Sequence, residues 1–279
     1  MKENTEFSVS VCVYKNDSPE DFKTAIESVL NQTVPPSQIV IVVDGEISKS
    51  LDAIVSNFEK NTVFDVVRLP QNTGHGNARR AGLEKCKHEL VAIMDADDIA
   101  TPERFEKQLE MFEKNEKLCV CGGNIAEFED TPENVISYRC VPSENDEIRK
   151  YMKKRCPFNQ MTVMFKKSEV MAVGGYVDWF RNEDYYLWLR LMQNGAEFAN
   201  SNEIFAKVRV EKDTYYRRGG LHYFKSEYKL QKYMLENHII DRLTYTVNIL
   251  KRFTVQVLLP GKMRRFVYNN FAREKTKNK

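Results

Sequence analysis

The sequence predicts an α/β fold built on a mainly parallel β-sheet with helices on both faces. Near-continuous apolar runs at 7–13, 38–44, 64–69 and 89–95 indicate strands that are buried on both sides. Segments with helical spacing separate these runs, which is the pattern of a parallel sheet with crossover helices. With 279 residues, of which 42% are hydrophobic, the chain can bury a large core.

The first helix is expected to follow the strand at 7–13. Ser18 is the expected N-cap and Pro19 occupies the first turn. Ala25, Ile26 and Val29 then fall on one face, as an amphipathic helix requires. Further helices are predicted at 50–60 and 77–86, and another is predicted to open at Thr101 and run to about residue 115.

Polar residues follow three of the predicted strands. Tyr14 comes after the first strand, Asp44 ends the second, and the sequence AIMDADDI carries Asp95, Asp97 and Asp98 after the fourth. Ligands of parallel sheets bind beyond the carboxyl ends of the strands, so these side chains are expected to share one site. Clustered carboxylates resist ionising together unless a cation lies among them. The cluster therefore predicts Mg²⁺ or Mn²⁺ that bridges the protein to a diphosphate.

The cluster has two other interpretations. Asp98 and its neighbours could be solvated turn residues that lead into the helix at Thr101. A phosphatase of the haloacid dehalogenase type also has an aspartate pair at a strand end, in the pattern DxDx(T/V). Its nucleophile follows the first strand, whereas here the strand is the fourth and Ile99 stands at the fifth position.

Composition excludes some classes of function. The formal net charge of +2 gives no sign of a nucleic-acid-binding protein. The first residues contain no long apolar run behind a basic start, so no signal peptide is expected. The six cysteines form no CxxC pair and are expected to be free, buried thiols in a reducing compartment.

Several motifs together resemble family 2 glycosyltransferases of the GT-A fold, the bacterial group that builds O-antigen and capsule polysaccharides. These motifs occur in family order and cover about residues 7–210: VSVCVYKND, AIESVLNQT, IVIVVDGE, NTGHGNARRAGLEKCKHELVAIMDADDIATPERFEKQ, NQMTVMFKKSEVMAVGGY and NEDYYLWLRLMQNG. The resemblance implies a Rossmann-like nucleotide-binding domain and an inverting transferase that uses a UDP-sugar with Mn²⁺ or Mg²⁺.

The resemblance also implies roles for individual residues in donor binding. Asp97 matches the metal-binding aspartate of the DxD motif, and Asp95 matches the one near the ribose and the metal. Asp44 matches the aspartate that reads the uracil base, although the family more often has two acids there and this chain keeps only the second. Arg79 matches an arginine near the nucleotide.

Two further positions belong to the predicted nucleotide-sugar site. Tyr14 lies in the first nucleotide-contacting loop, and Gly74 allows the backbone to approach the ligand closely.

A second acidic site follows in RNEDYYLWLRLMQNG. An acidic pair at a helix start can simply complement the helix dipole. The resemblance instead implies that Asp184 is the general base, which takes a proton from the acceptor hydroxyl. Glu183 and Trp179 are predicted to bind the acceptor. Partial burial beside a tryptophan would raise the pKa of Asp184 usefully.

The chain changes character from about residue 212. Residues 1–211 are predicted to form the GT-A domain, with a nucleotide-sugar half at about 1–100 and an acceptor half at about 101–211. Residues 212–279 are predicted to form a helical region rich in aromatic and basic residues. Residues 251–279 contain nine Lys or Arg and one acid, and the apolar stretch 243–259 is too short to span a bilayer.

The sequence thus predicts a cytoplasmic enzyme that is peripheral on the inner face of the cell membrane, where the basic tail contacts anionic lipid. Its donor is expected to be a UDP-hexose and its acceptor a saccharide on undecaprenyl diphosphate, with a β-1,3 link to an N-acetylhexosamine. A solvated C-terminal helix is the alternative for the tail. A non-catalytic sugar-nucleotide-binding protein and a sugar-nucleotide nucleotidyltransferase are the alternatives for the function.

Overall fold

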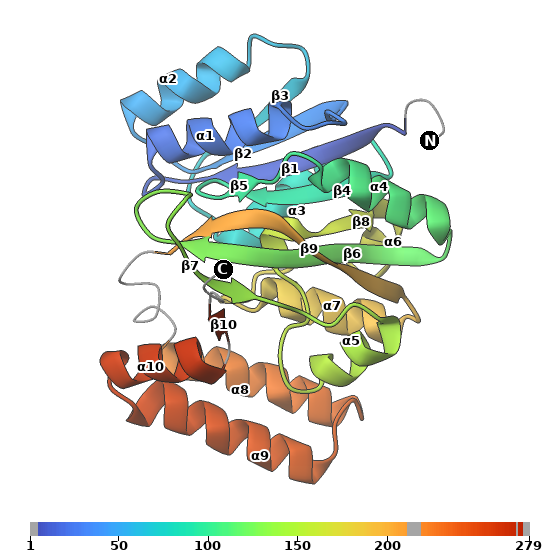
Figure 1. The fold of residues 1–279 in the computed structure, drawn as a ribbon, viewed down its shortest axis with the longest axis vertical. Coiled ribbons are helices and arrows are strands. Elements are labelled where there is room, and N and C mark those ends of the chain that lie inside the picture. Colours follow the sequence, from blue (N-terminus) through green and yellow to red (C-terminus); the bar gives the residue numbers. More distant parts are fainter. Residues whose placement is uncertain (1–4, 211–218, 272, 276–279) are drawn as a thin grey trace.

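The computed structural model describes residues 5–210, 219–271 and 273–275. Its strands form one mixed sheet in the order β10-β7-β6-β8-β4-β1-β2-β3 (Figure 1). The parallel part consists of β3 (Phe64–Leu69), β2 (Gln38–Asp44), β1 (Phe7–Val13) and β4 (Leu90–Asp95). This confirms the four strands predicted in the first half of the chain.

The second half of the chain extends the sheet beyond β4. The short strand β8 (Met164–Lys166) is antiparallel to β4 and is followed in the sheet by β6 (Leu118–Phe128). The edge beyond β6 is β7 (Val135–Arg139), while β9 (Glu197–Arg209) runs parallel to β6 and also pairs with β5 (Ile99–Ala100).

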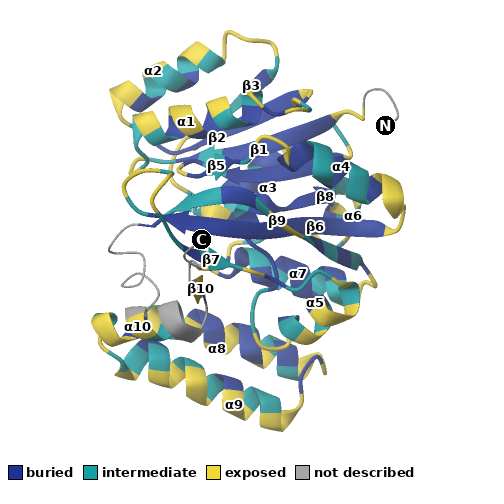
Figure 2. Ribbon diagram, viewed as in Figure 1, coloured by how far each residue is buried: buried dark blue, intermediate teal, exposed yellow. Residues whose placement is uncertain are grey.

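Helices cover both faces of the sheet, and a separate hydrophobic core lies between the sheet and the helices on each face (Figure 2). Successive strand residues point to opposite faces, so Ile39 and Ile41 pack on one side while Val40 and Val42 pack on the other. The first face is covered by α1 (Pro19–Leu30), α2 (Lys49–Phe58) and α4 (Arg104–Lys114). The second is covered by α3 (His75–Lys85), α5 (Asn145–Met152), α6 (Lys167–Ala172) and α7 (Glu183–Gln193).

Two predicted helix starts are corrected by the structure. Helix α3 begins at His75, two residues before the predicted start, with Gly74 as its N-cap. Helix α4 begins at Arg104 instead of Thr101. The reason is that Thr101 continues the contact between β5 and β9: its N–H donates to the carbonyl of Phe205 and its hydroxyl to the carbonyl of Ile204.

The C-terminal region contains the predicted helices, α8 (Leu221–Glu236), α9 (Arg242–Phe253) and α10 (Gly261–Phe271), with a π-helical segment at Thr254–Leu258. The predicted boundary at residue 211/212 falls in 211–218, outside the described residues. The chain then returns to the sheet as β10 (Glu274–Lys275), which pairs with β7 and was not predicted. Arg273 anchors this return through an ion pair of 2.6 Å with Glu127.

Within the described parts of the chain, no helix is both long and apolar enough to cross a bilayer. All six cysteines are free thiols, as predicted. They are not all buried, because Cys140 is exposed and Cys12 and Cys156 are half-buried.

Candidate active site

A cleft of about 1420 Å³ opens at the carboxyl ends of the parallel strands and extends to the C-terminal helices α8 and α9. Every residue that the sequence assigned to the site lines this cleft: Tyr14, Asp44, Gly74, Arg79, Asp95, Asp97, Trp179, Glu183 and Asp184. The structure therefore brings together the two acidic motifs, which are almost ninety positions apart in the sequence.

Strand register places the donor-side residues next to one another. In the parallel part of the sheet, Cys12 is aligned with Val42 on one side and with Asp95 on the other. Tyr14, Asp44 and Asp95 therefore lie at nearly the same height along the strand direction, at the carboxyl edge of the sheet. The ring of Tyr14 lies 6.3 Å from that of His75 at the start of α3. This edge is where a parallel sheet binds its ligand.

Arg79 connects the two acidic motifs. One guanidinium nitrogen lies 2.6 Å from Glu183 Oε1, and the other lies 3.1 Å from Asp95 Oδ1. The side chain is only 8% exposed. Burial opposes the charged form, but the carboxylates of Asp95 and Glu183 outweigh it and raise the pKa of Arg79 above its ordinary value. Arg79 is therefore a permanently charged link between the donor side and α7.

Glu183 is buried, and its two carboxylate oxygens differ in their hydrogen bonding. Oε1 accepts from Arg79, whereas Oε2 has no hydrogen-bond partner among the described residues. An unpaired buried oxygen costs free energy until a donor reaches it.

Asp184 has the properties of a general base. Burial and the neighbouring charge of Glu183 raise its pKa to about 6, against the opposing effect of Arg79. Its Oδ1 accepts from the N–H of Tyr185 at 2.7 Å, and its Oδ2 lies 3.9 Å from the sulfur of Cys156. A carboxylate with a pKa near neutrality can accept a proton and release it at working pH.

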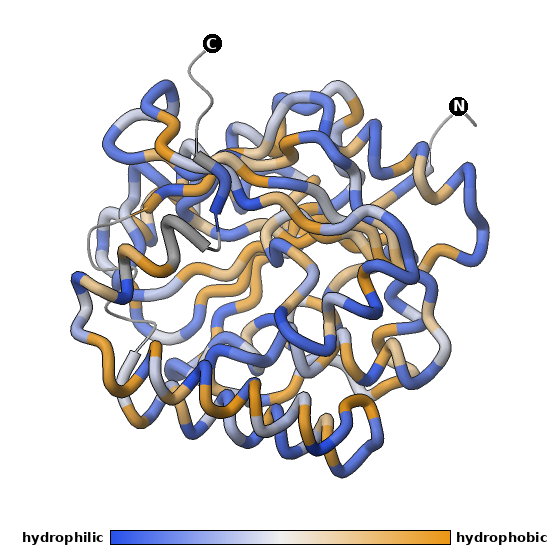
Figure 3. The backbone as a smooth tube through the Cα atoms, turned by 60° about the horizontal axis from the view of Figure 1, so that its bottom comes forward, coloured by the Kyte–Doolittle hydropathy of each residue, from blue (hydrophilic) through white to orange (hydrophobic). Residues whose placement is uncertain are grey.

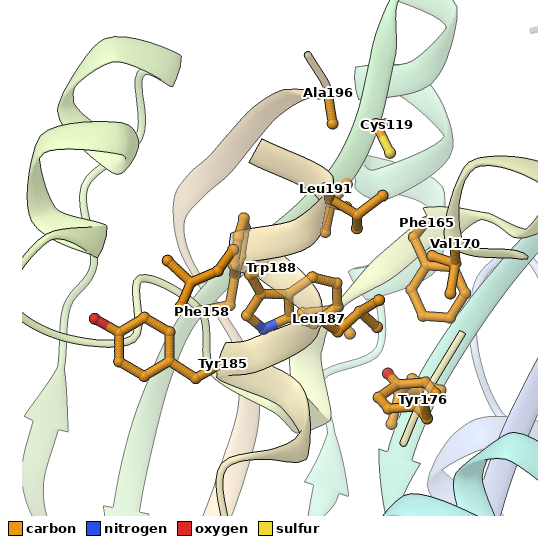
Figure 4. Close-up of a cluster of buried hydrophobic side chains, with 14 of the residues drawn as sticks. Cys119, Phe158, Phe165, Val170, Tyr176, Tyr185, Leu187, Trp188, Leu191 and Ala196 are labelled. Atoms are coloured by element: carbon orange, nitrogen blue, oxygen red, sulfur yellow. The ribbon is translucent and has the colours of Figure 1, made fainter. Parts of the chain in front are cut away.

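The helix that carries Asp184 is fixed by the core behind it (Figure 4). Tyr185, Leu187, Trp188 and Leu191 of α7 are all nearly or fully buried. Trp188 packs edge-on against Phe158, with ring centroids 5.3 Å apart. Because these side chains fix the rotation of the helix, Glu183 and Asp184 are held on the wall of the cleft.

The three aspartates of AIMDADDI have three different surroundings. Asp95 pairs with Arg79, Asp97 is exposed in the cleft, and Asp98 is buried, where it accepts from the N–H of Arg209 at 3.1 Å. Burial and the neighbouring charges of Asp97 and Asp95 raise the pKa of Asp98 well above its ordinary value. The alternative of solvated turn residues is therefore wrong for Asp98, which fastens the loop to β9.

The described residues hold no group of three or more metal-ligating side chains close enough to enclose an ion. Magnesium ordinarily takes one or two carboxylates and completes its shell with water and substrate phosphates. The side chains of Asp95 and Asp97, both on the cleft wall, fit that kind of open site.

Asp44 holds the loop that leads into α3. Its Oδ1 accepts from the N–H of Thr73 at 2.7 Å and from the hydroxyl of the same residue at 2.9 Å. Its Oδ2 accepts from Asn72 Nδ2 at 2.9 Å and from the N–H of Gly74 at 3.2 Å. Gly74 has a φ of 85°, a conformation that favours glycine.

Trp179 lies where the cleft meets the C-terminal helices. Its indole N–H donates to Ser226 Oγ of α8 at 3.0 Å, and the ammonium of Lys229 lies 4.2 Å from the centre of its ring. Asn182 also donates to Ser226 at 3.0 Å. Helix α8 is thereby fastened to the segment that immediately precedes Glu183.

Sequence reasoning missed several residues of the cleft. Asp17 accepts from the N–H of Tyr14 at 2.8 Å, and burial together with Asp97 and Asp95 raises its pKa to about 7. Lys154, Lys225, Lys229 and Lys251 line the far end. Asp17 ends the motif VSVCVYKND but was given no role. The lysines stand in no motif and come from three separate segments, so only the fold brings them together.

The sequence model described as "Glycosyl transferase family 2" matches residues 8–174. The chain belongs to glycosyltransferase family 2. The chain is therefore an enzyme of the transferase class, and the alternatives of a nucleotidyltransferase and of a non-catalytic binding protein are set aside.

Full-length relatives agree with this assignment. The chain is 38% identical to an uncharacterized glycosyltransferase of Haemophilus influenzae, covering 96% of this chain and 100% of the relative. It is 36% identical to the amylovoran biosynthesis glycosyltransferase AmsE of Erwinia amylovora, with 94% and 97% covered. It is 35% identical to the UDP-Gal:alpha-D-GlcNAc-diphosphoundecaprenol beta-1,3-galactosyltransferase of Escherichia coli, with 98% and 99% covered.

Solved structures confirm the fold. The crystal structure of residues 1–349 of S. aureus TarS superposes with a TM-score of 0.64 at 14% identity, covering 96% of this glycosyltransferase and 75% of that chain. A longer TarS structure gives a TM-score of 0.61 over 95% of this chain, which spans 46% of that one. The predicted GT-A fold with a C-terminal helical extension is thus confirmed.

Proposed function

We propose that this glycosyltransferase moves a hexose from a UDP-sugar to a hydroxyl of a lipid-diphosphate-linked saccharide during surface polysaccharide synthesis. The observation that carries the proposal is that Asp184 and the Asp95/Asp97 pair line one cleft, linked through Arg79 and Glu183. The donor and acceptor classes are supported by the similarity to the Escherichia coli enzyme, whose name specifies UDP-Gal and a GlcNAc diphosphoundecaprenol. By the same similarity we propose a β-1,3 link to an N-acetylhexosamine.

In this proposal the reaction is a single displacement with inversion at the anomeric carbon. Asp184 takes the proton of the acceptor hydroxyl as that oxygen attacks, and its raised pKa suits this task. Glu183, which lines the cleft beside Asp184, helps to orient the acceptor. Bound at Asp95 and Asp97, Mn²⁺ or Mg²⁺ would supply positive charge that stabilises the departing diphosphate. Tyr14, Gly74 and Asp44, with the loop that it holds, form the nucleoside side of the cleft.

We further propose that the enzyme is cytoplasmic and peripheral on the inner membrane face, with α9 and α10 against the lipid. Leu243 and Leu250 are seven residues apart and so lie on the same face of α9, where they are 73% and 60% exposed. Phe266 of α10 is 65% exposed. Figure 3 brings this end of the molecule forward and shows hydrophobic positions along the outer helices. Lys262 of α10 is exposed, as an anionic membrane surface would favour.

The decisive experiment is calorimetric binding of UDP, GDP and dTDP, each with and without Mn²⁺, to the wild type and to Asp97→Ala. The proposal expects UDP to bind more tightly than the other nucleotides, and to need both the metal and Asp97. Asp146→Ala is the matched control, because Asp146 is an exposed aspartate of α5 outside the cleft. Metal-independent binding, or no binding of any nucleotide, would contradict the proposal.

A further inference from the structure

The cleft has two ends of opposite charge. At the strand ends it is lined by Asp17, Asp44, Asp95 and Asp97. At the other end it is lined by four exposed lysines, here called the lysine end: Lys154, Lys225, Lys229 and Lys251. The volume of about 1420 Å³ exceeds the roughly 300–1,000 Å³ of an ordinary small-molecule pocket. There is room for two substrates, and their surroundings differ in charge.

The lysine end is not neutralised by the protein. Among the residues that the structure describes, the ammonium groups of Lys154, Lys225 and Lys251 lie within salt-bridge distance of no carboxylate. Glu227, the acid that lines the same end, is already engaged by Arg252 at 2.6 Å. This positive charge is therefore available to an anionic ligand.

The lysine end is also fixed relative to the candidate base. Lys154 stands two residues before Cys156, whose sulfur lies 3.9 Å from Asp184 Oδ2. The segment at 153–154 is held by the tail, since Asn248 donates to the carbonyl of Lys153 and Arg252 to that of Lys154. Lys225 and Lys229 flank Ser226, which is bonded to Trp179 and Asn182 just before Glu183. A ligand held by the lysines would therefore have a defined distance to Asp184.

We propose that the lysine end is the subsite for the diphosphate of the acceptor. This rests on the proposed function, in which the acceptor is a sugar esterified to a diphosphate. That diphosphate is attached to the sugar that carries the attacking hydroxyl, so binding it places the hydroxyl beside Asp184. Lysine is a common phosphate-binding residue and acts there as a point charge.

The opposite charges of the two ends also separate the two diphosphates. The donor diphosphate would bind at the aspartate end only together with a cation, whereas the acceptor diphosphate binds directly to ammonium groups. The acceptor diphosphate, which binds without a cation in this proposal, is therefore disfavoured at the aspartate end, because like charges oppose binding in a partly buried cleft.

The test assays the whole chain with three soluble acceptors: an N-acetylglucosamine diphosphate alkyl ester, the corresponding monophosphate ester, and the neutral alkyl glycoside. For the wild type, kcat/KM should decrease in that order. In Lys225→Ala/Lys229→Ala, the ratio of kcat/KM for the diphosphate over the neutral acceptor should fall about tenfold or more, chiefly through the KM of the diphosphate acceptor, since a charged hydrogen bond is lost at each position.

Lys232→Ala is the matched control, because Lys232 is an exposed lysine of the same helix that lies outside the cleft and pairs with Glu236. It should leave the ratio unchanged. UDP affinity of the double variant, measured by calorimetry, reports whether the donor side is still folded. An unchanged ratio in a double variant that binds UDP normally would overturn the proposal.

Three other outcomes are distinguishable. If the double variant loses binding to acceptor-free anionic vesicles while the ratio stays at the wild-type value, the lysines bind lipid headgroups and the subsite proposal fails. If the wild type transfers sugar with no preference for the diphosphate, the subsite fails while the proposed function stands. If no UDP-sugar supports transfer to any of the three acceptors, the proposed function itself fails.

Discussion

The guanidinium of Arg79 lies 2.6 Å from the carboxylate of Glu183, although 104 positions separate the two residues in the sequence. Arg79 belongs to α3 on the nucleotide side, and Glu183 opens α7 directly before the candidate base. The same arginine reaches Asp95 at 3.1 Å. One buried cation thus sets the position of the start of α7 relative to the AIMDADDI motif.

Removing this cation should destabilise the protein strongly. Arg79→Ala leaves the buried carboxylate of Glu183 unpaired, and breaking a buried ion pair in this way costs about 3–5 kcal/mol. Denaturant titration should show this loss of unfolding free energy. Arg80→Ala is the control, because Arg80 is exposed and pairs with Glu84 one turn away. Equal stability of the two variants would show that the Arg79 link carries little energy.

Replacing the candidate base should abolish turnover and spare donor binding. Asp184→Asn retains shape but cannot accept a proton, so kcat should fall by about 10²–10⁴. UDP affinity should stay within about twofold of the wild type, because Asp184 is not on the nucleotide side of the cleft. A variant with full activity would refute the assignment of Asp184 as the base.

The pH dependence of the reaction gives a separate check on Asp184. Its pKa is raised to about 6, and only the deprotonated form can act as a base. The value of kcat/KM should therefore rise as the pH increases through about 6 and level off above it. A profile that is flat between about pH 5 and about pH 8, which brackets this pKa by about one unit or more on each side, would contradict a base with this pKa.

The same raised pKa predicts how stability responds. The folded protein binds the proton of Asp184 more tightly than the unfolded chain, whose aspartate has the ordinary value of 3.8. The contribution of this group to stability is therefore present below that value and is lost as the pH rises towards about 6. Asp184→Asn should thus be at least as stable as the wild type at pH 8, a pH chosen about two units above the folded pKa, and a thermal melt would show it.

Asp44 offers a test between two roles. In the structure its carboxylate accepts four hydrogen bonds from residues 72–74, whereas the family resemblance assigns it to reading the uracil base. If it acts by holding the loop, Asp44→Ala should weaken UDP, GDP and dTDP by a similar factor. If it reads the base, the variant should lose the preference for UDP. Calorimetry with the three nucleotides separates these outcomes, and we expect the loop effect to dominate.

The proposed membrane face predicts a loss of vesicle binding in Leu243→Ser/Leu250→Ser. Both side chains are largely exposed, so the substitutions should leave the thermal melt nearly unchanged. Co-sedimentation with vesicles rich in anionic lipid should fall. Met171→Ser is the control, since Met171 is an exposed apolar residue of α6 on another part of the molecule. Equal binding by the two proteins would assign α9 to a solvated role.

The strands and helices of the first half could be predicted from the sequence because local patterns determine them. Buried parallel strands must be apolar throughout. Ser18 and Pro19 mark a helix start by local chemistry, since the side chain of Ser18 accepts from the N–H of Asp21 and Pro19 suits the first turn. The start of α4 could not be predicted in this way. Thr101 has a plausible capping side chain, but its hydrogen bonds go to Phe205 and Ile204, over a hundred residues further along the chain.

The sequence by itself determined the family, the α/β architecture and which carboxylates stand at strand and helix ends, since these depend on residue type and spacing. Only the tertiary structure decided how those carboxylates differ. Asp98 is buried against β9, Asp44 holds a loop, and Glu183 shares Arg79 with Asp95. The lysine end likewise exists only in the folded chain. Burial and charge pairing depend on neighbours that are distant in sequence, and these interactions set the chemistry of each group.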